Sequence, residues 1–115
     1  MNRPQQGELY FMRWGPGEGH EYMKTRPSLI VSSNKVLKYS NVLTCIPLTS
    51  NQEKMQRGDI LVQKNAMNRL MFDSVLKVQH ISSWDSRRIV SYIGKVDDVL
   101  LNMLKDYLKD HFDIQ

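Results

Sequence analysis

The chain has 115 residues, a length that suits one domain over residues 1–115 and is too short for two ordinary domains. Its 41% hydrophobic and 24% charged residues are typical of a soluble globular protein. No window approaches the roughly 18 consecutive apolar residues of a membrane span, and the amino terminus lacks the apolar run of a signal peptide, so we expect a cytoplasmic protein without membrane association.

The formal charge of +4 is unevenly distributed along the chain. From Asp97 onward, five aspartates and two lysines give a charge of −3, so residues 1–96 carry +7. A basic body favours an anionic partner such as nucleic acid, although ordinary surface charge explains the same balance. The single cysteine, Cys45, excludes an intrachain disulfide.

The first two thirds of the sequence predict short strands. Residues 7–14 alternate in the period of a strand, and the glycines of segment 15–19 then end it in a flexible loop. Apolar runs at 28–33 and 42–48 predict buried strands, separated by a polar segment. Further apolar runs predict strands at residues 58–62, 74–81 and 89–94, with a polar turn at 82–88.

The end of the chain has a different period. Between residues 96 and 112 the apolar side chains recur every three or four positions, which predicts an amphipathic helix. Asp97 and Asp98 stand at its start, where the helix dipole favours acids. The sequence therefore predicts a mainly β fold with helices (α+β), a small barrel on which a C-terminal amphipathic helix packs.

Three residues are candidates for chemistry on phosphate. Arg26 precedes Pro27, which biases the arginine towards an extended backbone, and its guanidinium matches a phosphate at two points. Thr49 follows a predicted strand and offers a hydroxyl donor. His20 titrates near neutrality and can carry a proton. Taken singly, each also fits a plain surface or turn residue.

Neither a metal nor a cofactor is expected. The histidines and carboxylates are scattered, and the chain contains neither HExxH nor the GxxxxGK[ST] loop of nucleotide-binding proteins. The glycine-rich GPGEG at 15–19 carries an acid where a phosphate cradle would avoid one.

The order of the motifs is more specific than any one of them. It resembles that of the PemK/MazF family from about residue 7 to about residue 110, and the Arg-Pro and Thr-Ser blocks carry the resemblance best. The matching segments are GELY at 7–10, a Pro-Gly loop with GHE at 19–21, TRP at 25–27, IVS at 30–32, PLTSN at 47–51, DSVL at 73–76 and IGK at 93–95, followed by the predicted helix.

Members of that family are the toxins of bacterial toxin-antitoxin pairs and act as metal-independent endoribonucleases on single-stranded RNA. The resemblance implies an SH3-like β-barrel with a C-terminal helix, which works as a homodimer whose interface forms the RNA groove. It also implies a cognate antitoxin, an acidic and partly disordered protein that occupies the same basic groove.

The resemblance assigns catalysis to Arg26 and Thr49, and proton transfer to His20. The residues expected to bind RNA are Ser50, Lys24, Lys77, Gln79 and Tyr22, and Trp14 and Trp84 are stacking candidates for which core or dimer packing is an equal explanation. One position departs from the family. Gln79 stands where an acid is usual, and an amide cannot serve as a base.

Two other functions remain open at this point. A non-enzymatic toxin of the same fold would poison DNA gyrase through its C-terminal end, but residues 111–115 carry no signature for it. An RNA-binding module that has lost catalysis would account for Gln79.

Overall fold

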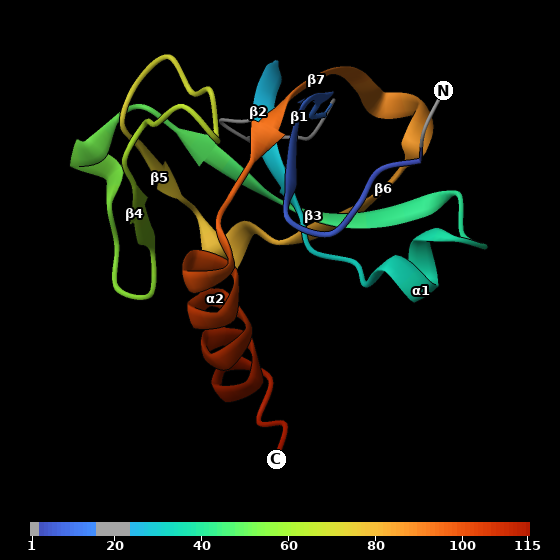
Figure 1. The fold of residues 1–115 in the computed structure, drawn as a ribbon. Coiled ribbons are helices and arrows are strands. Elements are labelled where there is room, and N and C mark those ends of the chain that lie inside the picture. Colours follow the sequence, from blue (N-terminus) through green and yellow to red (C-terminus); the bar gives the residue numbers. More distant parts are fainter. Residues whose placement is uncertain (1–2, 16–23) are drawn as a thin grey trace.

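The computed structural model of the chain describes residues 3–15 and 24–115. A seven-stranded antiparallel sheet dominates it, with the strand order β4-β5-β3-β2-β1-β7 and with β6 added to β3 (Figure 1). The strands are β1 (Glu8–Arg13), β2 (Thr25–Ile30), β3 (Val42–Thr49), β4 (Ile60–Val62), β5 (Ser74–Leu76), β6 (Ser82–Asp85) and β7 (Ile89–Lys95). The helices are α1 (Asn34–Leu37) and α2 (Asp98–His111).

Strand β3 connects the two halves of the sheet. Its first half, Val42–Cys45, pairs with β6, and its last residues, Leu48 and Thr49, pair with β5. Its other edge pairs with β2. Figure 1 shows β3 crossing the molecule, with β4 and β5 near one end and α1 near the other. Among the described strands β4 and β7 do not pair with each other, so the sheet is barrel-like but not closed.

Apolar side chains pack on both faces of the sheet. Neighbours such as Leu29 and Ile30, or Ile46 and Cys45, point to opposite faces and join different clusters. The larger cluster includes Leu9, Leu29, Ile46, Leu48, Leu76, Ile93 and Leu104, and the smaller one includes Met12, Trp14, Ile30, Leu37, Leu43 and Cys45.

Helix α2 covers the larger cluster. It begins after Asp97, whose carboxylate accepts a hydrogen bond of 2.8 Å from the backbone N–H of Leu100. Leu104 is fully buried, whereas Val99, on another side of the helix, is 79% exposed. In the part of the chain that the structure describes, no helix is long and apolar enough to span a membrane.

The predicted barrel-like fold with a C-terminal helix is confirmed, with local differences. Strand β2 begins at Thr25, earlier than predicted, and the polar segment before β3 contains the short helix α1. The predicted strand 74–81 ends at Leu76 and continues as a 3-10 helix, Val78–His80. The predicted turn at 82–88 holds β6, because the polar side chains of Ser82 and Ser83 do not prevent pairing with β3.

Replacing Leu104 should test how far the helix stabilises the sheet. Leu104→Ala leaves a cavity in the larger cluster and should lower the free energy of unfolding by about 2–5 kcal/mol in urea denaturation. Val99→Ala, on the exposed side of the same helix, should change it by less than about 0.5 kcal/mol. Equal losses in the two variants would contradict this packing.

Candidate active site

Two predicted site residues, Arg26 and Thr49, lie on the neighbouring strands β2 and β3. The two strands are antiparallel, with Ser28 opposite Pro47 and Leu29 opposite Ile46. The pairing ends at Ser28 and Pro47, and Arg26 and Thr49 each stand two residues beyond that end. Cross-strand partners point to the same face of a sheet, so residues that are far apart in the sequence lie on one surface at one end of β3.

The hydroxyl of Thr49 is held by the turn that follows it. Thr49 is 8% exposed, and its Oγ1 accepts a hydrogen bond of 3.2 Å from the backbone N–H of Asn51. The side chain of Asn51 in turn accepts from the N–H of Glu53 and caps a 3-10 helix, Gln52–Lys54. Because a hydroxyl that accepts still has its own proton, Thr49 can donate to a ligand.

Arg26 extends from a rigid part of β2. The residue is half-buried and pairs with Met12 of β1, which is fully buried. Two residues on, the hydroxyl of Ser28 donates to the carbonyl oxygen of Arg26 at 3.1 Å and accepts from the indole Nε1 of Trp14 at 2.9 Å. The backbone that carries the guanidinium is therefore held by strand pairing and by a buried hydrogen bond.

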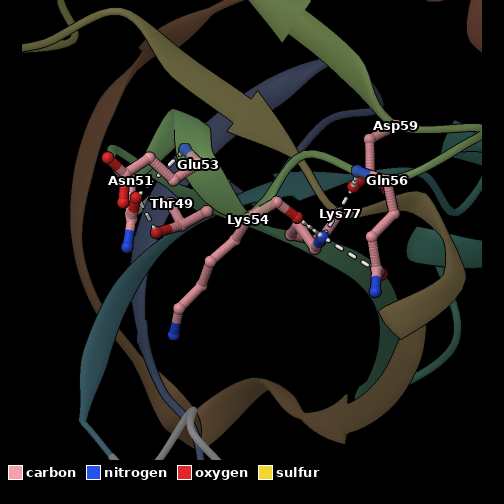
Figure 2. Close-up of polar contacts among 7 residues, drawn as sticks. All are labelled: Thr49, Asn51, Glu53, Lys54, Gln56, Asp59 and Lys77. Carbon is pink, nitrogen blue, oxygen red and sulfur yellow. Dashed lines mark hydrogen bonds and ion pairs between the residues drawn. The ribbon is translucent and has the colours of Figure 1, made fainter.

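Lys77 lies in a buried cluster instead of on the surface. It is 2% exposed, and its Nζ donates to Asp59 Oδ2 and to the carbonyl oxygen of Lys54 at 2.6 Å each, and to Gln56 Oε1 at 3.3 Å (Figure 2). With all three N–H donors used, the ammonium has none left for a phosphate in this arrangement. Sequence reasoning placed Lys77 among the RNA contacts because its partner Asp59 could not be foreseen.

A basic pocket of about 710 Å³ opens where β1 ends and β2 begins. It is lined by Arg13, Trp14, Gly15, Lys24, Thr25, Asp85, Arg87 and Arg88. Among these described lining residues the one acid is Asp85, which accepts from the backbone N–H of Arg87 at 2.8 Å and from its Nε at 3.1 Å. These contacts, the backbone one first, hold the pKa of Asp85 below its usual range, and the basic side chains outnumber it within the described part of the lining.

Aromatic packing forms one wall of the pocket. The rings of Trp14 and Trp84 meet edge to face at 5.4 Å, and the guanidinium of Arg88 lies 4.2 Å from the centre of the Trp84 ring. Arg88 also donates to the carbonyl oxygens of Arg13 and Gly15. Trp14, at 5% exposed, is a core residue here, which leaves Trp84 as the more accessible ring.

The other predicted residues are dispersed. Lys24 lines the basic pocket and Ser50 is exposed next to Thr49. Gln79 is exposed in the 3-10 helix after β5. His20 and Tyr22 lie outside the described residues. Sequence reasoning missed Arg13, Arg87 and Arg88; the basic pair inside the segment read as a polar turn was the available signal for the last two.

Metal ligands do not gather in the described ranges, where no group of three or more His, Cys, Asp or Glu side chains could hold an ion. The carbonyl oxygen of Arg26 accepts from the hydroxyl of Ser28, and the hydroxyl of Thr49 accepts from a backbone N–H.

Comparison with known proteins identifies the family. Residues 5–112 match the family described as the PemK-like, MazF-like toxin of type II toxin-antitoxin systems. The chain belongs to this family. The resemblance seen in the order of the motifs is thereby confirmed over nearly the whole chain.

Individual relatives of the MazF type agree. The chain is 27% identical over 115 residues to the endoribonuclease MazF9 of Mycobacterium tuberculosis, covering 96% of this chain and 97% of that protein. The crystal structure of MazF from Deinococcus radiodurans superposes with a TM-score of 0.82 at 21% identity, covering 98% of this chain and 99% of that one. A mycobacterial endoribonuclease in complex with its cognate antitoxin gives 0.76 at 17% identity, with 97% of each chain covered. The two structural likenesses establish the MazF fold.

The buried ion pair of Lys77 with Asp59 leads to a prediction about the stability of the fold. Asp59→Ala leaves the Lys77 ammonium buried without its counter-charge and should lower the free energy of unfolding by about 3–5 kcal/mol in urea denaturation. The double variant Lys77→Met/Asp59→Leu, which replaces both charges by apolar groups, should recover most of the loss.

The exposed pair of Asp85 with Arg87 serves as the control. Its side chains are 40% and 88% exposed, so Asp85→Ala should leave the unfolding midpoint nearly unchanged. A loss as large as that of Asp59→Ala would show that burial does not set the strength of these two pairs.

Proposed function

We propose that the chain is a metal-independent endoribonuclease that cleaves single-stranded messenger RNA in the cytoplasm at preferred sequences, and that this activity makes it a toxin. The observation that carries the proposal is the pairing of β2, the strand that bears Arg26, with β3, the strand that ends at Thr49. Membership of the toxin family and likeness to a protein named endoribonuclease MazF9 support it.

The proposed reaction uses the RNA as its own nucleophile. The ribose 2′-oxygen forms a bond to phosphorus, and the bond from phosphorus to the 5′-oxygen breaks. A base takes the proton of the 2′-hydroxyl, and an acid gives a proton to the leaving 5′-oxygen. Negative charge builds on the non-bridging oxygens, where the guanidinium of Arg26 and the hydroxyl of Thr49 donate. Because DNA lacks the 2′-hydroxyl, only RNA is cleaved.

Proton transfer is proposed for His20, the side chain of the site whose ordinary pKa is closest to neutrality. The amide of Gln79 cannot take a proton, so the acid that is usual at this position has no direct substitute there. In the sequence, His20 stands between β1 and β2, six residues before Arg26.

The RNA is proposed to run from Thr49 and Ser50 past Arg26 to the basic pocket, where Lys24 and Arg13 meet phosphates. In this proposal two copies of the chain form a homodimer, and the RNA groove follows their interface. An acidic antitoxin binds the same positive surface and excludes RNA.

The two competing functions have less support. Neither the family nor the relatives favour a gyrase poison. The C-terminal residues 112–115 are exposed and lie beyond the end of α2. A module without catalysis would bind RNA and leave it intact, so one cleavage assay separates it from a nuclease.

The assay compares cleavage of a mixed-sequence RNA in EDTA at enzyme excess. Arg26→Ala and Thr49→Ala should each reduce the rate about 10²- to 10³-fold, because each removes a donor to the phosphate in the transition state. Both variants should remain folded, as circular dichroism will check. Uncut RNA with the wild-type protein would refute the nuclease.

Two matched substitutions control for the loss of side chains. Arg69→Ala removes an exposed arginine from the loop between β4 and β5, and Thr44→Ala removes a threonine from the other half of β3. Both should cleave at nearly the wild-type rate. If they lose as much activity as the site variants, the assignment of Arg26 and Thr49 fails.

Salt dependence tests the basic pocket separately from catalysis. In a Thr49→Ala background, in which cleavage is slow on the time scale of a binding measurement, Arg13→Gln should weaken RNA binding at low salt and reduce the slope of log affinity against log salt by about 0.7, the value for one phosphate contact of a single strand. Lys109→Gln, on α2, should leave the slope unchanged. Identical slopes for wild type and Arg13→Gln would remove Arg13 from the RNA path.

A further inference from the structure

Lys77 is a buried cation that the proposed cleavage does not use. Its ammonium has three N–H donors, and Asp59, Gln56 and the carbonyl of Lys54 supply three acceptors. The side chains of Lys77 and Asp59 are each only 2% exposed. Burying a charge is costly unless it is paired in this way, so the role of Lys77 lies in what it holds together.

What it holds is the Thr49 loop, the segment 50–59 between β3 and β4. All three acceptors belong to this loop, whose residues 51–57 are exposed to solvent. At the far end of the loop, Gly58 has a φ of +91°, and a Cβ there would overlap the ring of Tyr107 on α2. The loop is thus exposed along its length and fixed to the body of the protein at Lys77 and near Gly58.

The hydrogen bonds of the loop lead from Lys77 back to Thr49. Thr49 accepts from Asn51, Asn51 caps the 3-10 helix Gln52–Lys54, and the carbonyl at the end of that helix accepts from Lys77 (Figure 2). The backbone N–H of Lys77 donates at 3.0 Å to the carbonyl of Pro47, two residues before Thr49. Lys77 therefore holds the chain on both sides of Thr49.

We propose that Lys77 is a positioning residue: through its ion pair with Asp59 it fixes the Thr49 loop, and so sets the direction in which the Thr49 hydroxyl donates. The inference rests on the proposed function, because it concerns the cleavage site. Its physical basis is the steep dependence of such reactions on geometry, in which a displacement of about 1 Å costs on the order of 10²-fold in rate.

Asp59→Asn distinguishes a positioning residue from a phosphate ligand by the sign of its effect. If Lys77 binds phosphate, loss of the competing carboxylate should strengthen RNA binding and leave cleavage equal or faster. If Lys77 positions the loop, cleavage at saturating RNA should fall about 10-fold in Asp59→Asn and about 10²-fold in Lys77→Met, while RNA affinity changes less than about threefold. Lys64→Met, which removes an exposed lysine outside the loop, is the charge control.

A double-mutant cycle tests whether the effect passes through Thr49. In the Thr49→Ala background the hydroxyl is already absent, so Lys77→Met should reduce cleavage by much less than its factor in the wild-type background. Equal factors in the two backgrounds would overturn the inference, since a general loss of folding or of RNA binding acts on both alike.

Limited trypsin digestion tests the loop without reference to activity. Lys54 and Arg57 are cleavage sites inside the Thr49 loop, and both should be cut about 10-fold faster in Lys77→Met and in Asp59→Asn than in the wild type, because local opening exposes the backbone. Asp59→Asn keeps an oxygen acceptor for the ammonium and so retains more of the fold. Arg69 lies in a different loop and should be cut at an unchanged rate.

The two readouts separate the two hypotheses. A wild-type protein that leaves RNA intact refutes the proposed function. Digestion of the loop still tests whether Lys77 fixes the Thr49 loop. If trypsin cuts Lys54 and Arg57 at an unchanged rate in the variants, or cuts Arg69 faster by an equal factor, then Lys77 does not fix the Thr49 loop, whatever the RNA assay gives.

Discussion

Pairing of β3 on both of its edges is the constraint on which the rest of the structure depends. One edge meets β2, and the other is shared between β6 at its start and β5 at its end. Since hydrogen-bonded register fixes which residues stand opposite each other, this single strand sets which face of the sheet Arg26 and Thr49 share. It also brings β5 to the point where Lys77 can reach the loop that leaves β3.

The basic residues of the chain occupy two different environments. Those of the pocket, such as Arg13 and Arg87, are exposed, so salt screens them and their charge acts collectively on an anionic strand. Lys77 is shielded from solvent and satisfied by the chain itself. The ion pair of Lys77 with Asp59 adds nothing to the net charge, so a count of the basic residues, and not the net charge, overstates what is available to a partner.

The sequence was a good guide to the elements with a clear period and a poor one to those without it. Alternation marked β1, and the helical spacing of leucines marked α2. Helix α1 has only four residues, too few for a period to appear. Strand β6 has a polar sequence without a strand period, because its stability comes from pairing with β3 and from the partly buried ring of Trp84.

For the site, the sequence motifs predicted which residues to consider, but they did not predict the distances between those residues. Arg26 and Thr49 are predictable as a pair because the family keeps both blocks in order, and antiparallel register then explains their meeting. The partner of Lys77 is eighteen positions away in a different segment, and no periodicity links the two. Whether Lys77 and Asp59 meet depends on the path of the loop, and that path is known only from the fold.

The pairing of β1 with β7 also sets the order in which the protein can form. These strands come from the two ends of the chain, Glu8–Arg13 and Ile89–Lys95, and they close the largest loop of the sheet. During synthesis β1 can pair with β2 early, but its other edge must wait for β7 until nearly all the chain has left the ribosome. A fragment that ends before β7 therefore leaves one edge of β1 open, and an open strand edge can pair with other chains.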